Sequence, residues 1–304
     1  MRFLVLGGTA FVGRAIVADA LARGHDLTLF SRGRTGPDLF PGVARARGDR
    51  DTGDYASLAT GEWDAVIDVT AYVPRHVRQI LDAVAGRFGR YILISTGSVY
   101  DHAEAPEASM DESAVRLPPE LGTEEITGET YGPLKVACED VAVARLAIGA
   151  TIVRPGIVAG PYDPTDRFTW WVRAASPGGL VEAPIRADQP VQVVDSRDLA
   201  RLVVRLAEDD RPGTFNAVGP AEPVTAAELV RVCAAAADRT AELVAGAPRE
   251  GFPLTLVDAA WDPMFRRSAA RAYAAGMPRT PLAVTAADVL AWDRARGLPE
   301  LAVS

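Results

Sequence analysis

LGGTAFVG, residues 6–13, joins a short apolar stretch to a segment with helical periodicity. Gly7 permits a tight turn, the small Ala10 lets backbone approach a pyrophosphate, and Gly13 lets the helix pack on the strand. The amide donors and the positive dipole end of the helix then suit a phosphate. The spacing is G-x-x-A-x-x-G, unlike the G-x-G-x-x-G of the dehydrogenases. The stretch predicts a dinucleotide-binding turn at the first strand of a parallel sheet.

Short stretches that are apolar throughout alternate with helical stretches along the first half of the chain. The expected strands are Arg2–Leu6, Leu27–Phe30, Val43–Arg47, Ala65–Val69, Tyr91–Ile94 and Thr151–Val153, and the expected helices are Phe11–Arg23, Val77–Val84 and Lys135–Ile148. Apolar strands that alternate with helices indicate a parallel sheet covered on both faces. We therefore expect an α/β fold, a Rossmann-type doubly wound parallel sheet with a smaller C-terminal substrate lobe.

The regularity loosens from about Pro155 onward, where proline is frequent and the strands are short. We expect residues 1–155 to form the dinucleotide-binding domain, with segments near 191–217 returning to it. Residues 156–304 are expected to form mainly a substrate-binding lobe, interleaved with the first domain. Three segments carry a specific expectation: strands that rejoin the main sheet at Val191–Val194 and Thr214–Ala217, and helix over Ala226–Ala247.

The composition of the 304 residues is that of an ordinary soluble globular protein, with 48% hydrophobic and 24% charged residues. The net charge of −8 argues against a surface for nucleic acid or for an anionic membrane. The N-terminal apolar run is too short for a signal peptide or a membrane span, so we expect a cytoplasmic location. Cys138 and Cys233 are expected to be reduced thiols. No metal site is expected, because His25, His76 and His102 share no ligand-like spacing.

The end of the second strand predicts which nucleotide binds. An NAD site usually places a carboxylate there, whereas an NADP site places a cation for the 2′-phosphate. Ser31 stands at that position and Arg32 and Arg34 follow it, so NADP is favoured, with NAD possible. Two solvated loop arginines are the competing interpretation. After the third strand, the carboxylate of Asp49 is placed to accept a hydrogen bond from the adenine amino group.

YGPLK, residues 131–135, contains the only lysine of the chain. Residues four apart share a helix face, and Pro133 is tolerated only in a first turn, so Tyr131 and Lys135 are expected together at a helix start. A nearby ammonium stabilises a phenolate and lowers the pKa of a tyrosine. Lysine also suits donation to ribose hydroxyls. An exposed lysine with a tyrosine upstream by chance is the competing interpretation.

The fifth strand ends in ISTGSVY, residues 94–100. A hydroxyl at this carboxyl end of a strand can orient a substrate oxygen toward Tyr131. Thr96 is the expected group, with Ser95 and Ser98 as alternatives; serine and threonine are also common turn formers. Residues at the strand ends that we expect to bind the cofactor are Gly7, Thr9, Ala10, Phe11, Val12, Gly13, Ser31, Arg32, Arg34, Asp49, Arg50, Val69, Thr70, Ala71 and Lys135.

These motifs together resemble the extended and atypical short-chain dehydrogenases/reductases, the family of NAD-dependent epimerases and dehydratases. The resemblance extends to RPGIVAGPYDPTDRF after the sixth strand and to VVDSRDLA further on. It implies a catalytic triad of Thr96, Tyr131 and Lys135, with Pro155, Gly156, Ile157 and Val158 at the nicotinamide end. Residues expected in the substrate pocket are Tyr72, Ser98, Tyr100, Arg154, Arg167, Trp171 and Gln192.

Two departures from the family's patterns bear on the reaction. Gly97 and Ser98 stand where sugar-nucleotide dehydratases carry an Asp–Glu pair, and Val191 stands where epimerases carry a diphosphate-binding arginine. We expect an NAD(P)-dependent oxidoreductase that acts on a carbonyl or an alcohol of a small metabolite. The alternatives are an epimerase or isomerase that cycles the hydride internally, and a non-catalytic dinucleotide-sensing or RNA-binding relative. A homodimer would fit family habit.

Overall fold

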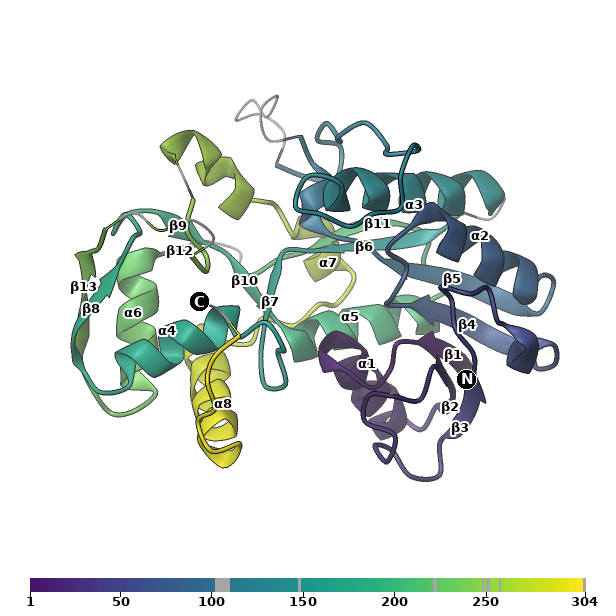
Figure 1. Cartoon of the computed structure of the whole chain (residues 1–304), viewed down its shortest axis with the longest axis horizontal. Coiled ribbons are helices and arrows are strands. Elements are labelled where there is room, and N and C mark those ends of the chain that lie inside the picture. Colours follow the sequence, from purple (N-terminus) through teal and green to yellow (C-terminus); the bar gives the residue numbers. More distant parts are fainter. Residues whose placement is uncertain are drawn as a thin grey trace.

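The computed structural model describes residues 1–101, 110–146, 149–220, 223–247, 249, 252–256 and 258–302. Its centre is a parallel sheet of seven strands in the order β11-β6-β5-β4-β1-β2-β3 (Figure 1). The strands are β1 (Arg2–Leu6), β2 (Asp26–Ser31), β3 (Ala44–Arg47), β4 (Trp63–Asp68), β5 (Phe88–Ile94), β6 (Thr151–Pro155) and β11 (Gly213–Ala217). The predicted doubly wound α/β fold is confirmed.

Helices cover both faces of this sheet. The helices α1 (Phe11–Ala22) and α5 (Ser196–Glu208) pack on one face, and α2 (Pro74–Ala83) and α3 (Tyr131–Arg145) pack on the other (Figure 1). Successive side chains of a strand point to opposite faces, so Phe3 and Val5 enter the core under α1 and α5. Leu4 and Leu6 enter the core under α2 and α3. Burial on both faces explains why β1 is apolar at each of these positions.

The strand order reverses beside β1, which lies between β2 and β4. In an open parallel sheet, such a reversal leaves a crevice outside the carboxyl ends of the strands. The glycine turn after β1 and the strand ends of β2 and β4 open onto this crevice. The fold therefore directs the singled-out motifs to one edge of the sheet.

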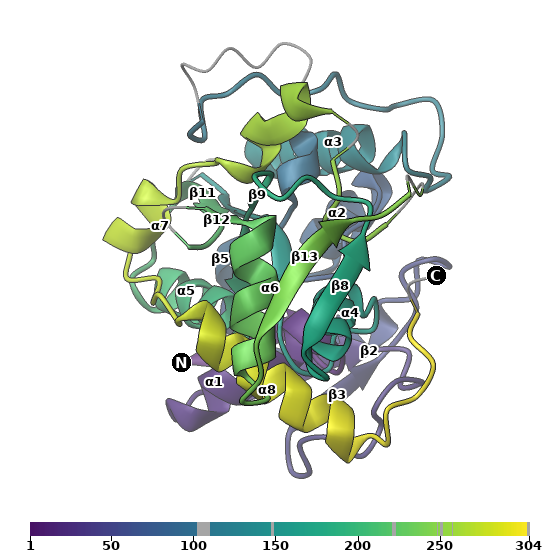
Figure 2. The same ribbon diagram turned by 90° about the vertical axis from the view of Figure 1, so that its left-hand side faces the viewer.

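A second core lies beyond the main sheet, on the left of Figure 1. Figure 2 shows its paired strands β8 and β13 beside α6 and α8. Its elements are α4 (Arg167–Ala175), β8 (Gly179–Ala183), α6 (Ala226–Ala235), β13 (Ala241–Ala245) and α8 (Leu282–Ala295). Shorter elements are β7 (Ile157–Ala159), β9 (Pro190–Val191), β10 (Val193–Asp195), β12 (Val224–Thr225) and α7 (Ala270–Ala274).

Two expectations about the second half of the chain are wrong. Val191–Val194 does not rejoin the main sheet: Val191 pairs with β12, and β10 pairs with β7. The helix expected over Ala226–Ala247 ends at Ala235, and β13 follows. Alanine has high helix propensity, but tertiary pairing with β8 determines the conformation of this segment.

Two further expectations concern a strand near residue 214 and the helix that contains Lys135. The strand predicted at Thr214–Ala217 does join the main sheet, as β11 beside β6. The helix predicted from Lys135 begins four residues earlier, at Tyr131, and its predicted end at Ile148 lies outside the described residues. Within the described part of the chain, no helix is long and apolar enough to cross a membrane.

Candidate active site

The turn after β1 has the close backbone packing that its glycines predict. Gly7 has a φ of 88°, and a Cβ there would lie 2.3 Å from the Thr70 methyl group. A Cβ at Gly13 would lie 1.9 Å from the carbonyl oxygen of Gly7. Ala10 caps α1, whose first turn carries no acidic residue. The turn therefore leaves the amide donors of α1 open to an anion.

A cavity of about 530 Å³, the main cavity, opens at the carboxyl ends of the strands. It is lined by the ends of β1, β4, β5 and β6 and by segments of the second half of the chain. Predicted cofactor and substrate residues along it are Gly7, Ala10, Phe11, Val12, Val69, Thr70, Tyr72, Thr96, Ser98, Tyr100, Tyr131, Lys135, Arg154, Pro155, Gly156, Ile157, Val158, Arg167 and Gln192.

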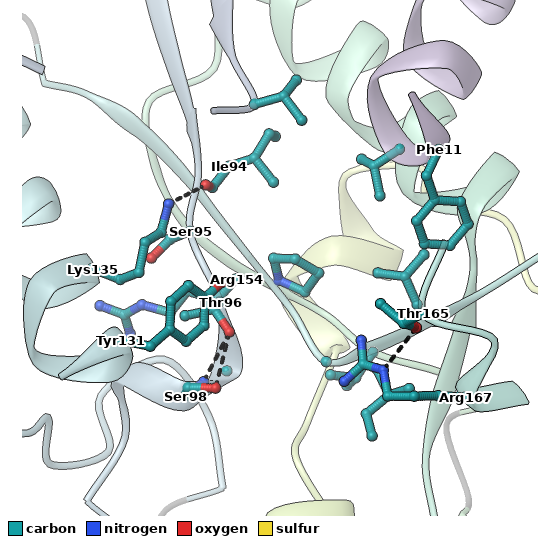
Figure 3. A pocket seen from close by; sticks show the side chains of 18 of the residues that line it. Phe11, Ile94, Ser95, Thr96, Ser98, Tyr131, Lys135, Arg154, Thr165 and Arg167 are labelled. Carbon is teal, nitrogen blue, oxygen red and sulfur yellow. Dashed lines mark hydrogen bonds between the residues drawn. The ribbon is translucent and has the colours of Figure 1, made fainter. Parts of the chain in front are cut away.

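Thr96 and Tyr131 lie on one wall of the main cavity (Figure 3). Thr96 caps the short helical turn Gly97–Val99: its hydroxyl accepts from the Ser98 backbone N–H at 3.1 Å and donates to the Ser98 hydroxyl at 3.2 Å. Tyr131 is the first residue of α3. Burial raises the pKa of the Tyr131 phenol, and the Thr96 hydroxyl opposes that rise. The phenol is therefore protonated at neutral pH.

Lys135 lies one helical turn after Tyr131 and is 2% exposed. Its ammonium donates to the carbonyl oxygens of Ala71 at 2.6 Å and Ile94 at 2.8 Å. An ammonium has three donors, so one remains for a further acceptor. Burial lowers the pKa of Lys135.

The structure corrects the expected electrostatic effect of Lys135 on Tyr131. We expected the ammonium to lower the pKa of the phenol, but burial dominates and raises it. The cation that acts to lower the pKa of Tyr131 is Arg167, across the cavity. Lys135 is turned toward backbone carbonyls instead, which the sequence spacing does not reveal.

A second cavity of about 250 Å³ lies beside the main one and shares Gly7, Ala10, Thr70 and Tyr72 with it. Predicted cofactor residues along it include Thr9, Ser31, Arg32, Arg34, Asp49 and Arg50. Gly13 and Ala71 line neither cavity: Gly13 packs against the turn, and the Ala71 carbonyl holds Lys135.

The arginines after β2 are exposed at the rim of the second cavity. Arg32 lies 3.5 Å from the carboxylate of Asp51, and both side chains are about half exposed or more, at 49% and 65%. Such an exposed pair contributes little, which leaves Arg32 available to a phosphate. Asp49, expected at the adenine, accepts from the Asp51 backbone N–H at 3.0 Å.

Arg50 forms a buried ion pair that was not predicted from the sequence. Its guanidinium donates to both carboxylate oxygens of Asp68, at 2.5 and 2.8 Å, and to Thr70 at 2.9 Å. Asp68 also accepts from the Tyr91 hydroxyl at 2.8 Å. Burial acts to raise the pKa of Asp68, but the charge and hydrogen bonds of Arg50, the hydrogen bond from Tyr91 and the charge of Lys135 together keep that pKa low. Arg50 therefore lines the second cavity with both terminal nitrogens bonded to protein groups.

Tyr100 and Arg154, expected to contact substrate, belong to another buried network. The Tyr100 hydroxyl donates to Asn216 at 2.6 Å and accepts from Arg154 at 2.9 Å. Arg154 pairs with Glu139 through two hydrogen bonds, of 3.0 and 2.7 Å. Both residues border the main cavity, but their polar atoms already form hydrogen bonds with other protein groups.

The remaining substrate candidates differ in position. Tyr72 is 42% exposed at the junction of the two cavities, and Arg167 projects from the wall opposite Tyr131 (Figure 3). Gln192 borders the main cavity with its amide bonded to the backbone of Arg267. Trp171 is a correction: it is fully buried in the second core, with its indole N–H donated to the Pro253 carbonyl. Aromatic side chains suit a core as well as a pocket, so sequence alone does not separate the two.

Several residues of the main cavity were not singled out from the sequence. They are Asp163, Thr165, Asn216, Met264, Phe265 and Arg267. Asp163 and Thr165 lie in the PYDPTDRF motif, which was noted without a role for these two residues. The other four come from segments far along the chain and carry no local motif.

Side chains that commonly bind metals do not converge in the described ranges. No cluster of three or more His, Cys, Asp or Glu side chains there is placed to hold a metal ion. His102 lies outside the described residues.

A sequence model of the NAD dependent epimerase/dehydratase family matches residues 3–218 of the chain. The chain is 23% identical over 254 residues to the chloroplast stem-loop binding protein of 41 kDa b of Arabidopsis thaliana, which covers 77% of this chain and 63% of that protein. It is 26% identical over 180 residues to the dTDP-6-deoxy-L-talose 4-dehydrogenase (NAD(P)(+)) of Kitasatospora kifunensis, covering 54% of each. The chain thus spans less than two thirds of the length of these relatives.

Among solved structures, the chain is similar to the UDP-glucose 4-epimerase of Thermus thermophilus in complex with NAD. The TM-score is 0.70 at 21% identity, over 97% of this chain and 99% of that one. At this identity the likeness shows a shared fold.

Proposed function

The chain belongs to the NAD dependent epimerase/dehydratase family, whose enzymes are of the short-chain dehydrogenase/reductase type, and we propose that it is an NAD(P)-dependent oxidoreductase. In this proposal Thr96, Tyr131 and Lys135 form the catalytic triad. The substrate is a carbonyl or an alcohol of a small metabolite, and NADP is the favoured cofactor.

The observation that carries the proposal is that all three side chains border one cavity. Thr96 and Tyr131 come from a strand end and a helix start that are distant in sequence, yet they lie on the same wall (Figure 3). This cavity continues into the second cavity at the glycine turn. A dinucleotide needs such an elongated site, with its pyrophosphate beside the turn.

The turn itself fits a dinucleotide. Glycine at positions 7 and 13 brings the backbone closer than any side chain would allow, so the amides of α1 are accessible to a pyrophosphate. Residues that would hold the nicotinamide end are Val69, Thr70, Lys135 and Pro155–Val158. The nicotinamide ring, when bound, supplies or accepts the hydride.

The protein's own groups handle the proton. Because burial raises the pKa of Tyr131, its phenol is held in the protonated form, which is the form that donates to a carbonyl oxygen during reduction. Thr96 lies beside it; its hydroxyl, which donates to the Ser98 hydroxyl in this structure, would turn its single proton to the same oxygen when substrate is bound. Lys135 keeps one free donor for a ribose hydroxyl, while its other two bonds fix the ammonium against β5 and the segment after β4.

NADP is favoured because Ser31, Arg32 and Arg34 border the second cavity at the end of β2. Ser31 brings no negative charge to the position where NAD sites commonly carry a carboxylate. Its hydroxyl accepts from the Gly33 backbone N–H at 3.2 Å, which shapes the loop that presents both arginines. Planar guanidinium groups suit a phosphate that NAD lacks.

A second candidate is an epimerase or isomerase that keeps the cofactor and cycles the hydride internally, which the family's name favours. The relative from Arabidopsis raises RNA binding as a further possibility, since it is named as a stem-loop binding protein. The net charge of −8 disfavours RNA, and a cavity with an intact triad has no use in a purely structural RNA contact.

A titration followed by a substrate screen tests the proposal. We expect NADPH and NADH to change the intrinsic tryptophan fluorescence of the protein, with tighter binding of NADPH. A panel of carbonyl compounds is then incubated with protein and NADPH, and loss of the reduced cofactor is followed by absorbance. Consumption of NADPH supports an oxidoreductase, epimerised product without net consumption supports the second candidate, and absence of dinucleotide binding refutes both.

A further inference from the structure

The wall opposite Thr96 and Tyr131 is formed by the loop of residues 160–166 and the first residue of α4, Arg167. Thr165 and Arg167 lie there, facing Thr96 and Tyr131 across the cavity (Figure 3). This segment is part of the GPYDPTDRF motif, and the triad gives it no role. Its side chains are therefore available for the substrate.

The 160–166 loop is anchored at two points. The guanidinium of Arg14, on α1, lies 3.5 Å from the ring centroid of Tyr162, a cation–π contact. Asp166 accepts hydrogen bonds from Arg296 at 2.6 Å and from the Ala302 backbone at 3.1 Å. Contacts on both sides thus hold the loop in place and fix the start of α4.

The side chain of Arg167 is oriented by the Thr165 hydroxyl, and its charge interacts with the nearby carboxylate of Asp163 without a direct ion pair. Its Nε donates to the Thr165 hydroxyl at 3.1 Å, which leaves both terminal NH₂ groups for another partner. Within the part of the chain that the structure describes, Arg167 has no ion pair, whereas Arg154 and Arg50 of the same site each have one. The terminal nitrogens of Arg167 lie on the side of the cavity that faces Tyr131 (Figure 3).

The charged side chains of the main cavity also favour an anionic ligand. The charged side chains along it are Lys135, Arg167 and Arg267, together with Arg154, which Glu139 neutralises, and the acidic Asp163. Asp163 is 1% exposed; burial raises its pKa, and hydrogen bonds from Thr165 and the charge of Arg167 oppose that rise. The protein carries a net charge of −8, so a positive cavity runs against its overall composition. Buried positive charge of this kind favours an anionic ligand.

Arg267 is a further cation along the main cavity. It is 4% exposed and its guanidinium lies 3.8 Å from the ring centroid of Tyr100. Burial, together with the charge of Arg154, lowers the pKa of Arg267, as expected where positive charges crowd.

We propose that Arg167 binds an anionic group of the substrate, a carboxylate or a phosphate, while the reacting carbonyl or alcohol lies at Thr96 and Tyr131. This inference rests on the proposed function and adds the class of substrate to it. The cavity of about 530 Å³ also takes the nicotinamide end of the cofactor, so the remaining space suits a small anionic metabolite.

The first test uses two simple anions, inorganic phosphate and malonate, as probes. Each is titrated by calorimetry into the full-length protein saturated with NADP, which occupies the other phosphate sites. We expect Arg167→Gln to weaken binding of the anion about 10-fold or more, because a charge-assisted hydrogen bond is lost. Arg167→Lys keeps a positive charge and should retain part of the affinity. Arg294→Gln, an exposed arginine on α8, is the matched control and should bind as the wild type does.

The two probes separate the possible anions, since tighter binding of phosphate indicates a phosphorylated substrate and tighter binding of malonate indicates a carboxylate. Equal anion affinity of the wild type and Arg167→Gln overturns the proposal. A second measurement compares NADPH consumption with 2-oxo acids and with their methyl esters. Arg167→Gln should raise KM for the acids about 10-fold and leave the esters nearly unchanged; equal effects on both would also overturn it.

The cofactor titration distinguishes failure of the anion subsite from failure of the proposed oxidoreductase function. If the wild type binds NADP and the Arg167→Gln variant binds the anion as tightly as the wild type does, only the proposed anion subsite is refuted. If the protein binds no dinucleotide but Arg167→Gln weakens anion binding, only the oxidoreductase proposal is refuted. Melting temperatures of all variants show whether any loss reflects unfolding.

Discussion

Replacing Glu139 with glutamine removes a negative charge that is buried directly beneath the proposed active site. Glu139 is fully buried on α3, one turn after Lys135. Its carboxylate accepts from the Ser95 hydroxyl at 2.5 Å, from Arg154 at 3.0 and 2.7 Å, and from Arg116 at 3.1 Å. The side chain thus ties α3 to the ends of β5 and β6, the elements that position Tyr131 and Thr96.

The expected loss of unfolding free energy follows from the buried charge of Arg154, which glutamine leaves without its carboxylate partner. Arg154 is 4% exposed, so without the carboxylate its charge remains buried with no other ion-pair partner among the residues that the structure describes. Breaking a buried ion pair in this way costs about 3–5 kcal/mol of unfolding free energy. Glutamine still accepts one hydrogen bond, which places the expected loss near the lower limit, about 3 kcal/mol. Unfolding entropy grows with chain length, at about 2.1 cal/mol/K per residue, so in a chain of 304 residues that loss lowers the melting temperature by roughly 5 °C.

The assay is thermal unfolding followed by circular dichroism, with Asp140→Asn as the matched control. Asp140 pairs with Arg116 at 3.0 Å at a partly exposed position, and its side chain is 44% exposed. Loss of such a pair costs about 1 kcal/mol or less. A Glu139→Gln protein that melts within about 2 °C of Asp140→Asn would refute the reasoning that the buried network stabilises this wall.

Three further predictions concern the cofactor and the proton. Replacing Arg32 and Arg34 together with glutamine should weaken NADP binding about 10-fold or more and NAD binding little, measured by fluorescence titration, and equal losses would exclude a phosphate clamp. Gly13→Ala should weaken binding of either cofactor and lower the melting temperature, because its Cβ would lie 1.9 Å from the Gly7 carbonyl oxygen; wild-type values for both would contradict the close packing. Burial raises the pKa of Tyr131, so carbonyl reduction should be constant around neutral pH and fall as pH rises through that pKa, while alcohol oxidation rises over the same interval. Profiles that move in the same direction for both reactions would argue against Tyr131 as the titrating group.

Much of the fold was predictable because parallel strands buried on both faces must be apolar throughout. The glycine turn was predictable for a similar reason, since Gly7 and Gly13 satisfy local backbone constraints that leave a mark in the sequence. The segment Val191–Val194 looked like another such strand, but its pairing depends on β7 and β12, which local pattern does not encode.

Contacts between distant parts of the sequence were likewise not predictable in the candidate active site. Helical spacing correctly predicted that Tyr131 and Lys135 share a helix start. It did not predict that Lys135 would be held by two backbone carbonyls, because those come from residues 64 and 41 positions away. Arg267 was missed for the same reason, since only tertiary folding brings it to Tyr100.

The acid–base role of Tyr131 is tested most directly by comparing Tyr131→Phe with Tyr162→Phe in the same NADPH-consumption assay. Tyr162 is 46% exposed outside the triad, and phenylalanine keeps the ring that Arg14 contacts. We predict that Tyr131→Phe lowers kcat about 10²- to 10⁴-fold with cofactor affinity unchanged, because only the proton donor is lost. Tyr162→Phe should remain close to wild type. A Tyr131→Phe enzyme with kcat within a few-fold of wild type would contradict the assignment of Tyr131 as the proton-transferring group.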